Sequence, residues 1–154
     1  MCVVAYEACM RGIDISVDEN DWSSPIVSLL AKRPEIAYID KQTGTHPKPL
    51  TRKIADASEA LEFLKSNIKS GGRYEFVSKL CIQDGFSHIL CIEKIKEGFR
   101  IIEPQNGTMS KTQVEVIQYL NLIDYSYPLT LLRVDNVDFT PQFLDFIRSK
   151  TDNV

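Results

Sequence analysis

The sequence is short of several residue types and patterns, and each shortage excludes a class of protein. Its four cysteines are too few and too irregularly spaced for a disulfide framework, and no Cys-x-x-Cys pair marks a structural zinc site. No run approaches the roughly 20 apolar residues of a membrane-spanning helix, and no signal peptide opens the chain. The formal net charge of -3 offers no general attraction to a phosphate backbone. We therefore expect reduced thiols, no metal, no cofactor, and neither nucleic acid nor a membrane as partner.

What the sequence does contain is the composition of an ordinary folded domain. Hydrophobic residues make up 44% and charged residues 25% of the chain, values that disfavour intrinsic disorder. The length of 154 residues is close to the commonest domain size and allows one sizeable core. We expect a single domain over residues 1–154.

Periodicity predicts helices first and then a run of antiparallel strands. Residues 2–11 form an apolar run that Gly12 ends, which predicts a short helix buried on nearly all faces. The other predicted elements are a strand at 13–17, a helix at 21–32, a strand at 36–40, a helix at 56–69, strands at 74–83, 86–96 and 98–105, a helix at 110–122 capped by Ser110, a strand at 129–134 and a helix at 140–148. This order predicts an α+β fold, with the buried N-terminal helix packed on an antiparallel sheet.

Cys2 stands in the first turn of the predicted N-terminal helix. Unpaired backbone N–H groups and the helix dipole favour a negative charge there, so this is a position that suits a nucleophilic thiolate. The alternative is that Cys2 is an apolar residue at a frayed chain end. A third possibility is that Met1 is removed and the amine of Cys2 acts as its own base.

His88 and Glu103 are the most suggestive pair on the predicted strands. An even number of residues between the two strands gives paired residues an odd sum, and His88 then shares a face with Glu103 and Gln105. A carboxylate beside an imidazole fixes its tautomer and stabilises its protonated form. An odd loop would place the two on opposite faces, and a strand histidine can instead be satisfied by a backbone carbonyl.

Cys81 is a rival to Cys2. A two-residue turn at Asp84 and Gly85 would pair Cys81 directly with His88, making it a candidate nucleophile or metal ligand. Mid-strand, no helix terminus would favour its thiolate, so we expect Cys81 to be a core residue, like Cys9 and Cys91. His46 is expected to be a solvated loop histidine.

Several segments of the chain resemble the papain-fold toxin domains (Tox-PL) of the glutamine deamidase type. The opening Cys-Val-Val-Ala-Tyr-Glu helix and the Arg-Gly-Ile-Asp-Ile that follows it are similar to the family's Cys-x-x-Cys-Val-Val-Ala-Tyr-Glu and Arg-Gly-Tyr-Asp-Val. Ser87 and His88 resemble its Gly-His-hydrophobic motif, and Glu103 to Gly107 resemble its Asp-Pro-Gln-Ser/Thr-Gly. The segments, in order, are 2–7, 10–15, 38–44, 87–90, 102–107 and 131–139.

This resemblance implies a papain-like cysteine protease fold and a role for each matched residue. Cys2 would be the nucleophile, His88 the general base, Glu103 the orienting carboxylate where the family usually has Asp, and Gln105 a supporting catalytic residue. The implied reaction is hydrolysis of protein carboxamides: glutamine deamidation, or proteolysis if the amide belongs to the backbone. Because the chain begins one residue before Cys2, we expect an upstream segment of the papain-like domain to be missing.

The resemblance also implies a biological setting. Such domains occur at the C-termini of polymorphic toxins and of phage minor head proteins. We therefore expect a glutamine-bearing protein substrate, a parent polypeptide or an immunity protein as a further partner, and a reducing cytoplasm, bacterial or of a target cell, as the site of action. The alternative function is a binding or virion-structural module that keeps the papain-like scaffold with impaired catalysis.

Overall fold

The computed structural model describes residues 2–13, 33–81, 87–104, 108–110 and 112–152, which belong to two compact units. Unit 1 combines residues 1–48 with 136–154, and unit 2 comprises residues 49–135. Within the described residues, unit 1 holds a two-stranded sheet and unit 2 a six-stranded sheet. The α+β class is therefore confirmed, whereas the expectation of one domain over the whole chain stays a prediction.

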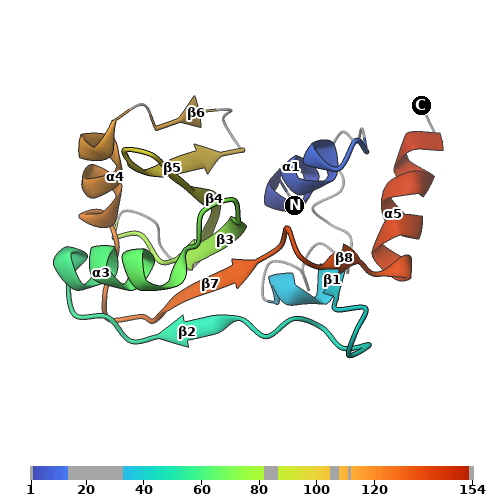
Figure 1. Cartoon of the computed structure of the whole chain (residues 1–154), viewed down its shortest axis with the longest axis horizontal. Coiled ribbons are helices and arrows are strands. Elements are labelled where there is room, and N and C mark those ends of the chain that lie inside the picture. The colour runs from blue at the N-terminus through green and yellow to red at the C-terminus, as the bar shows by residue number, and fades with distance from the viewer. Residues whose placement is uncertain (1, 14–32, 82–86, 105–107, 111, 153–154) are drawn as a thin grey trace. The chain divides into compact units, whose positions relative to one another are not determined.

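Unit 2 is built on an antiparallel sheet with the strand order β2-β7-β3-β4-β5-β6 (Figure 1). The strands are β2 (Leu50–Arg52), β3 (Arg73–Ser78), β4 (His88–Ile95), β5 (Gly98–Glu103), β6 (Thr108–Met109) and β7 (Leu129–Arg133). The central strands β3, β4 and β5 are rich in β-branched and aromatic residues, which favour extended backbone. They pair in chain order, so the predicted meander is confirmed.

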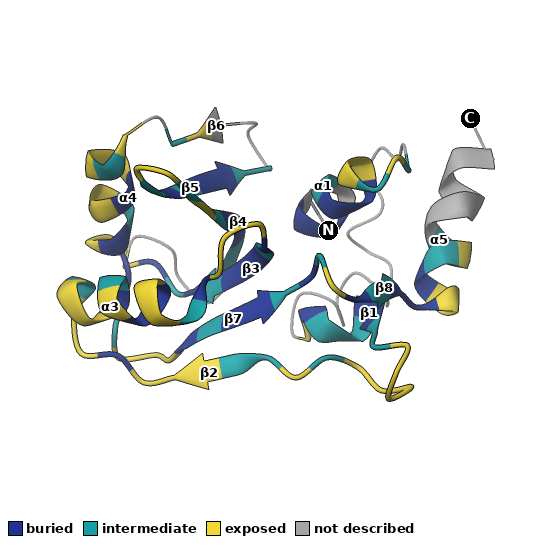
Figure 2. Cartoon of the chain, in the orientation of Figure 1, coloured by how far each residue is buried: buried dark blue, intermediate teal, exposed yellow. Residues whose placement is uncertain are grey.

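Two helices, α3 (Ala57–Asn67) and α4 (Gln113–Leu120), enclose the core of unit 2 against one face of this sheet. Asp56 caps α3 by accepting a hydrogen bond from the backbone N–H of Glu59 at 2.9 Å, which confirms the predicted helix. Alternate strand residues point into the core, and the buried stripes of both helices appear in dark blue in Figure 2. The core includes Leu64, Phe76, Leu90, Ile92, Ile101, Val116, Leu120 and Leu131.

The cap of α4 differs from the prediction. Thr112, not Ser110, accepts a hydrogen bond from the backbone N–H of Glu115, at 3.3 Å. Ser110 instead continues the strand pairing: its backbone N–H donates to the Ile101 carbonyl and its hydroxyl accepts from the Ile101 N–H, both at 2.9 Å. Because Ser110 is held by β5, the helix begins later than the sequence pattern suggests.

Unit 1 contains α1 (Cys2–Met10), the 3-10 helix η2 (Pro34–Ala37), β1 (Tyr38–Ile39), β8 (Asp138–Phe139) and α5 (Pro141–Asp152). Glu7, only 2% exposed, forms an ion pair with Arg11 at 2.9 Å. The Arg11 guanidinium lies 4.6 Å from the centre of the Phe139 ring, which stacks on Tyr38 with the ring centres 5.3 Å apart. Through these contacts, Arg11 at the end of α1 packs against the strand pair β1-β8.

The predicted elements of unit 1 are confirmed in part. α1 is confirmed, but burial on nearly all of its faces is wrong, because Cys9 and Met10 are exposed. The strand expected at 36–40 is limited to β1, since Pro34 opens a 3-10 helix that occupies the residues before Tyr38. The C-terminal helix is confirmed as α5. The predicted helix at 21–32 and residues 14–17 of the predicted strand lie outside the described residues.

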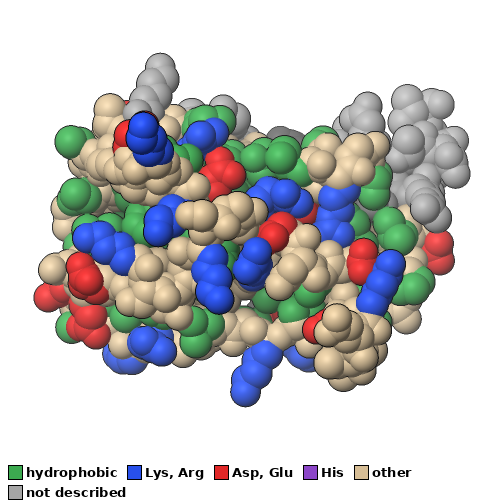
Figure 3. Space-filling view, in the orientation of Figure 1, with side chains coloured by type: hydrophobic (Ala, Val, Ile, Leu, Met, Phe, Trp, Pro, Cys, Tyr) green, Lys and Arg blue, Asp and Glu red, His purple; other side chains and the backbone are tan. Residues whose placement is uncertain are grey.

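Two further features of the described residues are the distribution of charged side chains and the character of the helices. On the face that Figure 3 draws, both Lys or Arg and Asp or Glu side chains are visible over unit 2. None of the helices in the part of the chain that the structure describes is long and apolar enough to cross a membrane.

The predicted packing of the N-terminal helix α1 on the large sheet stays a prediction.

Asp135, just after β7, forms an ion pair with Arg133 and accepts a hydrogen bond from the first residue of β3, Arg73. These contacts predict a pH dependence of stability. Burial alone would raise the pKa of Asp135, but hydrogen bonds from the Arg133 guanidinium (2.9 and 3.1 Å) and the Arg73 backbone N–H (2.9 Å) lower it overall. A pKa lowered by folding stabilises the protein above the unfolded value of about 3.9, and this contribution disappears as the pH falls through the folded pKa.

We therefore expect Asp135→Asn to reduce the free energy of unfolding by about 1–2 kcal/mol near neutral pH, measured by urea denaturation. The difference from the wild type shrinks toward zero as the pH falls below the lowered folded pKa of Asp135, where both proteins carry a neutral side chain at position 135. Asp138→Asn is the control, because Asp138 is 46% exposed in its pair with Lys41. A difference for Asp135→Asn that stays constant with pH contradicts the assignment.

Candidate active site

His88 and Glu103 lie on neighbouring strands and are hydrogen-bonded to each other. In the pairing of β4 with β5, Cys91 faces Ile102 and Ile95 faces Gly98, so paired residues have an odd sum and two residues connect the strands. His88, at the start of β4, and Glu103, at the end of β5, therefore point to the same face of the sheet. The predicted shared face is confirmed.

The connection between β4 and β5 explains why this register is fixed. Gly98 has a φ of +140°, a backbone conformation that other residues rarely adopt. The Gln113 side chain binds both backbone groups of Phe99, accepting from its N–H and donating to its carbonyl at 2.9 Å each. A Cβ atom at Gly98 would overlap with that side chain. Helix α4 thus holds the turn that sets the register in which His88 and Glu103 share one face of the sheet.

The hydrogen bond joins Nε2 of His88 to Oε2 of Glu103, and the two side chains are only 14% and 16% exposed. A carboxylate can only accept a hydrogen bond, so Nε2 of the neutral ring carries the proton. This tautomer leaves Nδ1 of His88 as the ring's acceptor. An imidazole held in this way can take a proton at Nδ1, and the carboxylate stabilises the resulting cation.

Cys81 does not face His88. The β3–β4 register places Ser78 opposite His88, and β3 ends at Ser78. The chain then turns toward the segment after α4, where the Cys81 N–H donates to the Leu122 carbonyl at 2.8 Å. The predicted strand at 74–83 is therefore too long, and the predicted Asp84-Gly85 turn lies outside the described residues.

Of the three cysteines expected in the core, only one is buried. Cys91 is buried in the sheet, as predicted, whereas Cys9 and Cys81 are exposed. Cys9 lies in the last turn of α1, and Cys81 lies three residues after the end of β3.

Ser78 and Tyr119 are two residues beside this pair that the sequence did not identify. Ser78 is 2% exposed and its hydroxyl is 3.1 Å from that of Tyr119 on α4. Burial raises the pKa of Tyr119 well above its usual value, the bond to Ser78 lowers it, and the Glu103 charge raises it further. Helical spacing places Tyr119 near the buried stripe of α4, but nothing in the sequence says that Ser78 pairs with His88.

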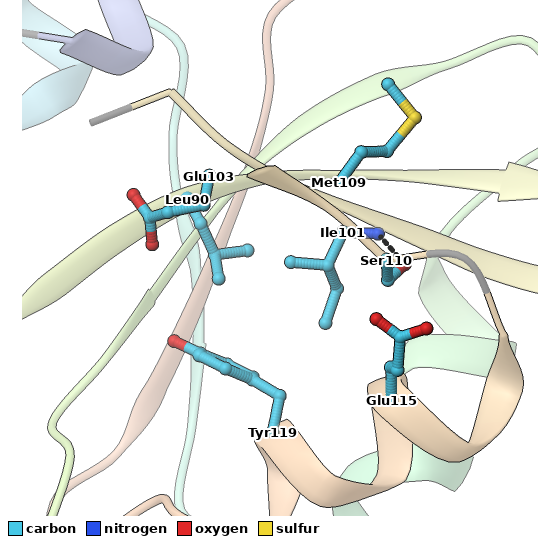
Figure 4. Close-up of a pocket in the computed structure, with 7 residues that line it drawn as sticks. All are labelled: Leu90, Ile101, Glu103, Met109, Ser110, Glu115 and Tyr119. Atoms are coloured by element: carbon cyan, nitrogen blue, oxygen red, sulfur yellow. Dashed lines mark hydrogen bonds between the residues drawn. The ribbon is translucent and has the colours of Figure 1, made fainter. Parts of the chain in front are cut away.

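A pocket opens next to Glu103, between α4 and the strands β4, β5 and β6. Its volume is about 270 Å³ and it is lined by Leu90, Ile101, Glu103, Met109, Ser110, Glu115 and Tyr119. Figure 4 shows Tyr119 reaching from α4 toward the sheet, with its hydroxyl on the side of the pocket where the Glu103 carboxylate lies. The carboxylate that holds His88 is therefore reachable from this pocket.

The remaining candidate residues have separate outcomes. Cys2 is the first residue of α1, as predicted, and belongs to unit 1, while His88 and Glu103 belong to unit 2. The pairing of Cys2 with His88 stays a prediction. Gln105 lies outside the described residues. His46 is an exposed loop histidine, as expected, and its Nδ1 is 2.7 Å from the Tyr38 carbonyl, to which it donates.

No group of three or more His, Cys, Asp or Glu side chains that could hold a metal ion occurs among the described residues. The chemistry that the His88–Glu103 pair itself offers is proton transfer, because Nδ1 of the ring can take a proton and later release it.

Comparison of the chain with known protein families and with curated proteins found no match.

Proposed function

We propose that this protein is a papain-like cysteine hydrolase that deamidates glutamine side chains of protein substrates. The observation that carries the proposal is the hydrogen bond between His88 Nε2 and Glu103, which makes Nδ1 the proton acceptor of a carboxylate-oriented imidazole. The position of Cys2 as the first residue of α1 supplies the second part, because a helix N-terminus favours a thiolate. The resemblance to the Tox-PL family favours glutamine as the substrate.

The reaction follows from the roles of these three side chains. His88 takes the Cys2 proton at Nδ1, and the thiolate attacks the carboxamide carbon of glutamine. The tetrahedral intermediate then breaks its C–N bond while the His88 imidazolium gives a proton to the departing ammonia, which leaves a thioester. Water, deprotonated by His88, hydrolyses the thioester to a glutamate side chain and regenerates the thiol. Glu103 stabilises the imidazolium in both steps.

The proposal includes a setting for this reaction. A reducing compartment keeps a thiol nucleophile from oxidising, which suits action in a cytoplasm as part of a larger toxin or phage protein. The protein substrate bearing glutamine is the partner that the chemistry requires, and an immunity protein would bind over the same residues to block it.

The proposed function is tested by incubating the full chain with protein extracts of bacterial and eukaryotic cells and mapping the products by mass spectrometry. We expect glutamine residues converted to glutamate, with stoichiometric ammonia release, that the Cys2→Ala variant does not produce. New chain termini without such conversions would show a peptidase instead. If neither product forms, the protein is a binding module and not a hydrolase.

Variants of Glu103 separate its charge from its hydrogen bond. Glu103→Gln keeps an oxygen acceptor for the Nε2 proton but loses the charge that stabilises the imidazolium, and Glu103→Ala loses both. We expect the rate of ammonia release to fall about tenfold to a hundredfold in Glu103→Gln and about a thousandfold in Glu103→Ala.

The matched control is Glu93→Ala, which removes another cross-strand carboxylate of β4 and β5, paired with Arg100 at 3.3 Å. We expect this variant to retain the wild-type rate. Equal losses in Glu93→Ala and Glu103→Ala would mean that the hairpin, and not the carboxylate beside His88, is what activity requires.

A further inference from the structure

The hydroxyl pair of Ser78 and Tyr119 lies beside the His88–Glu103 pair without belonging to it. Ser78 is directly opposite His88 in the β3–β4 register, so both side chains point to the same face. Tyr119 reaches this face from α4 and bonds to Ser78 at 3.1 Å. Three strands and one helix thus bring four polar side chains to one end of an otherwise apolar core.

The Glu103 side chain can adopt many rotamers, but only some of them place its carboxylate against the His88 ring. A glutamate side chain has three rotatable bonds, and only a few of its rotamers direct a carboxylate oxygen to Nε2 of His88. The side chain is 16% exposed, so rotamers that reach water compete with the one that holds the imidazole. Something must select the productive rotamer.

We infer that Tyr119, held by Ser78, is a positioning residue that fixes the Glu103 carboxylate against His88. The Tyr119 hydroxyl and the Glu103 carboxylate line the same side of the pocket (Figure 4). When Ser78 donates to the Tyr119 oxygen, the Tyr119 proton is available to the carboxylate. The influence of the Glu103 charge on the pKa of Tyr119, which it raises, agrees with this proximity. The inference rests on the proposed function only for its catalytic consequence.

The two histidines of the chain allow a direct readout. The structure assigns them opposite neutral tautomers, with the proton on Nε2 in His88, which donates to Glu103, and on Nδ1 in His46, which donates to the Tyr38 carbonyl. Nitrogen-15 NMR of the full chain, at a pH where both rings are neutral, distinguishes the tautomers. His46 is the internal reference in every spectrum.

Tyr119→Phe removes one hydroxyl and keeps the ring. We expect the ratio of the Nε2–H to the Nδ1–H tautomer of His88 to fall roughly three- to tenfold, because Glu103 loses the neighbouring hydroxyl that favours its productive rotamer, while His46 does not change. Ser78→Ala is the second variant and is expected to shift His88 in the same direction by a smaller factor.

Tyr125→Phe is the matched control. Its hydroxyl also ends a partly buried side chain and donates to the Leu120 carbonyl at 2.6 Å, near the end of α4. We expect it to lower the stability of the protein without changing the His88 spectrum. If His88 responds equally to Tyr119→Phe and Tyr125→Phe, or to neither, the positioning role is refuted.

The outcome separates this inference from the proposed function, because the spectra are recorded without substrate. An active wild type whose His88 is unchanged in Tyr119→Phe refutes the positioning role alone. A wild type that releases no ammonia but whose His88 depends on Tyr119 refutes the glutamine deamidase alone. In an active protein, Tyr119→Phe lowers kcat about as much as it lowers the tautomer ratio and leaves KM unchanged.

Discussion

We expect replacement of Cys2 with alanine to lower the proposed release of ammonia from protein glutamine by roughly 10⁴- to 10⁶-fold. In the proposed mechanism Cys2 supplies the atom that attacks the carboxamide carbon, and loss of a covalent nucleophile would remove the whole acyl-enzyme route. The rate is measured by coupled ammonia detection on the extract fraction that the wild type modifies. No other described cysteine is placed as the first residue of a helix.

Cys9→Ala is the matched control for this prediction. Cys9 lies on the same helix, near its other end, and is exposed, so its removal tests the effect of losing a thiol from α1 without losing the nucleophile. We expect Cys9→Ala to keep the wild-type rate. Activity that survives Cys2→Ala, or that is lost equally in Cys9→Ala, would show that the sulfur of Cys2 is not the nucleophile.

Replacing His88 with alanine is expected to lower the rate by a similar factor, roughly 10⁴-fold or more. In the proposed mechanism His88 accepts the thiol proton and later returns it to ammonia, so both steps would fail without it. Because nucleophile and base act as one unit, the double variant Cys2→Ala/His88→Ala should be no slower than the slower single variant. Multiplied losses in the double variant would mean that the two residues act independently.

His46→Ala is the matched control for His88→Ala, because it removes the other histidine of the chain, an exposed one in unit 1. We expect it to retain the wild-type rate, with circular dichroism confirming that both variants fold. A loss of activity in His46→Ala as large as that in His88→Ala would refute the role of the His88–Glu103 pair.

The sequence predicted the elements whose limits are set locally. Helix α3 has a side-chain cap at Asp56 and a clear apolar stripe, so its position follows from nearby residues alone. The shared face of His88 and Glu103 was predictable for the same reason. It depends only on whether an even number of residues connects β4 and β5, and a short connection near Gly98 meets that condition.

The sequence failed where a distant segment decides the local structure. The chain leaves β3 at Ser78 because its following backbone groups pair with the segment after α4, which no local pattern near Cys81 reveals. Serine is a common helix cap, yet both the backbone N–H and the hydroxyl of Ser110 form hydrogen bonds with Ile101 of β5. The role of Tyr119 follows from Ser78, whose partner depends on the β3–β4 register, so it required the structure.

The resembled Tox-PL motif usually has aspartate where this chain has Glu103, and the structure shows how the longer side chain is placed. The side chain reaches His88 despite its additional methylene group. Tyr119 of α4 and the Glu103 carboxylate line the same pocket. Glutamate departs from the motif at this position, but its carboxylate still forms the hydrogen bond with His88.

The central claim is that the Cys2 sulfur and the His88 imidazole act together, and competitive alkylation tests it most directly. The full chain is treated with limiting iodoacetamide near neutral pH, and the modified cysteines are mapped by mass spectrometry, with the exposed Cys9 and Cys81 as internal standards. We predict that Cys2 reacts at least tenfold faster than either standard and that His88→Ala removes this difference. Labelling of Cys2 no faster than Cys81, or unchanged by His88→Ala, would contradict the account.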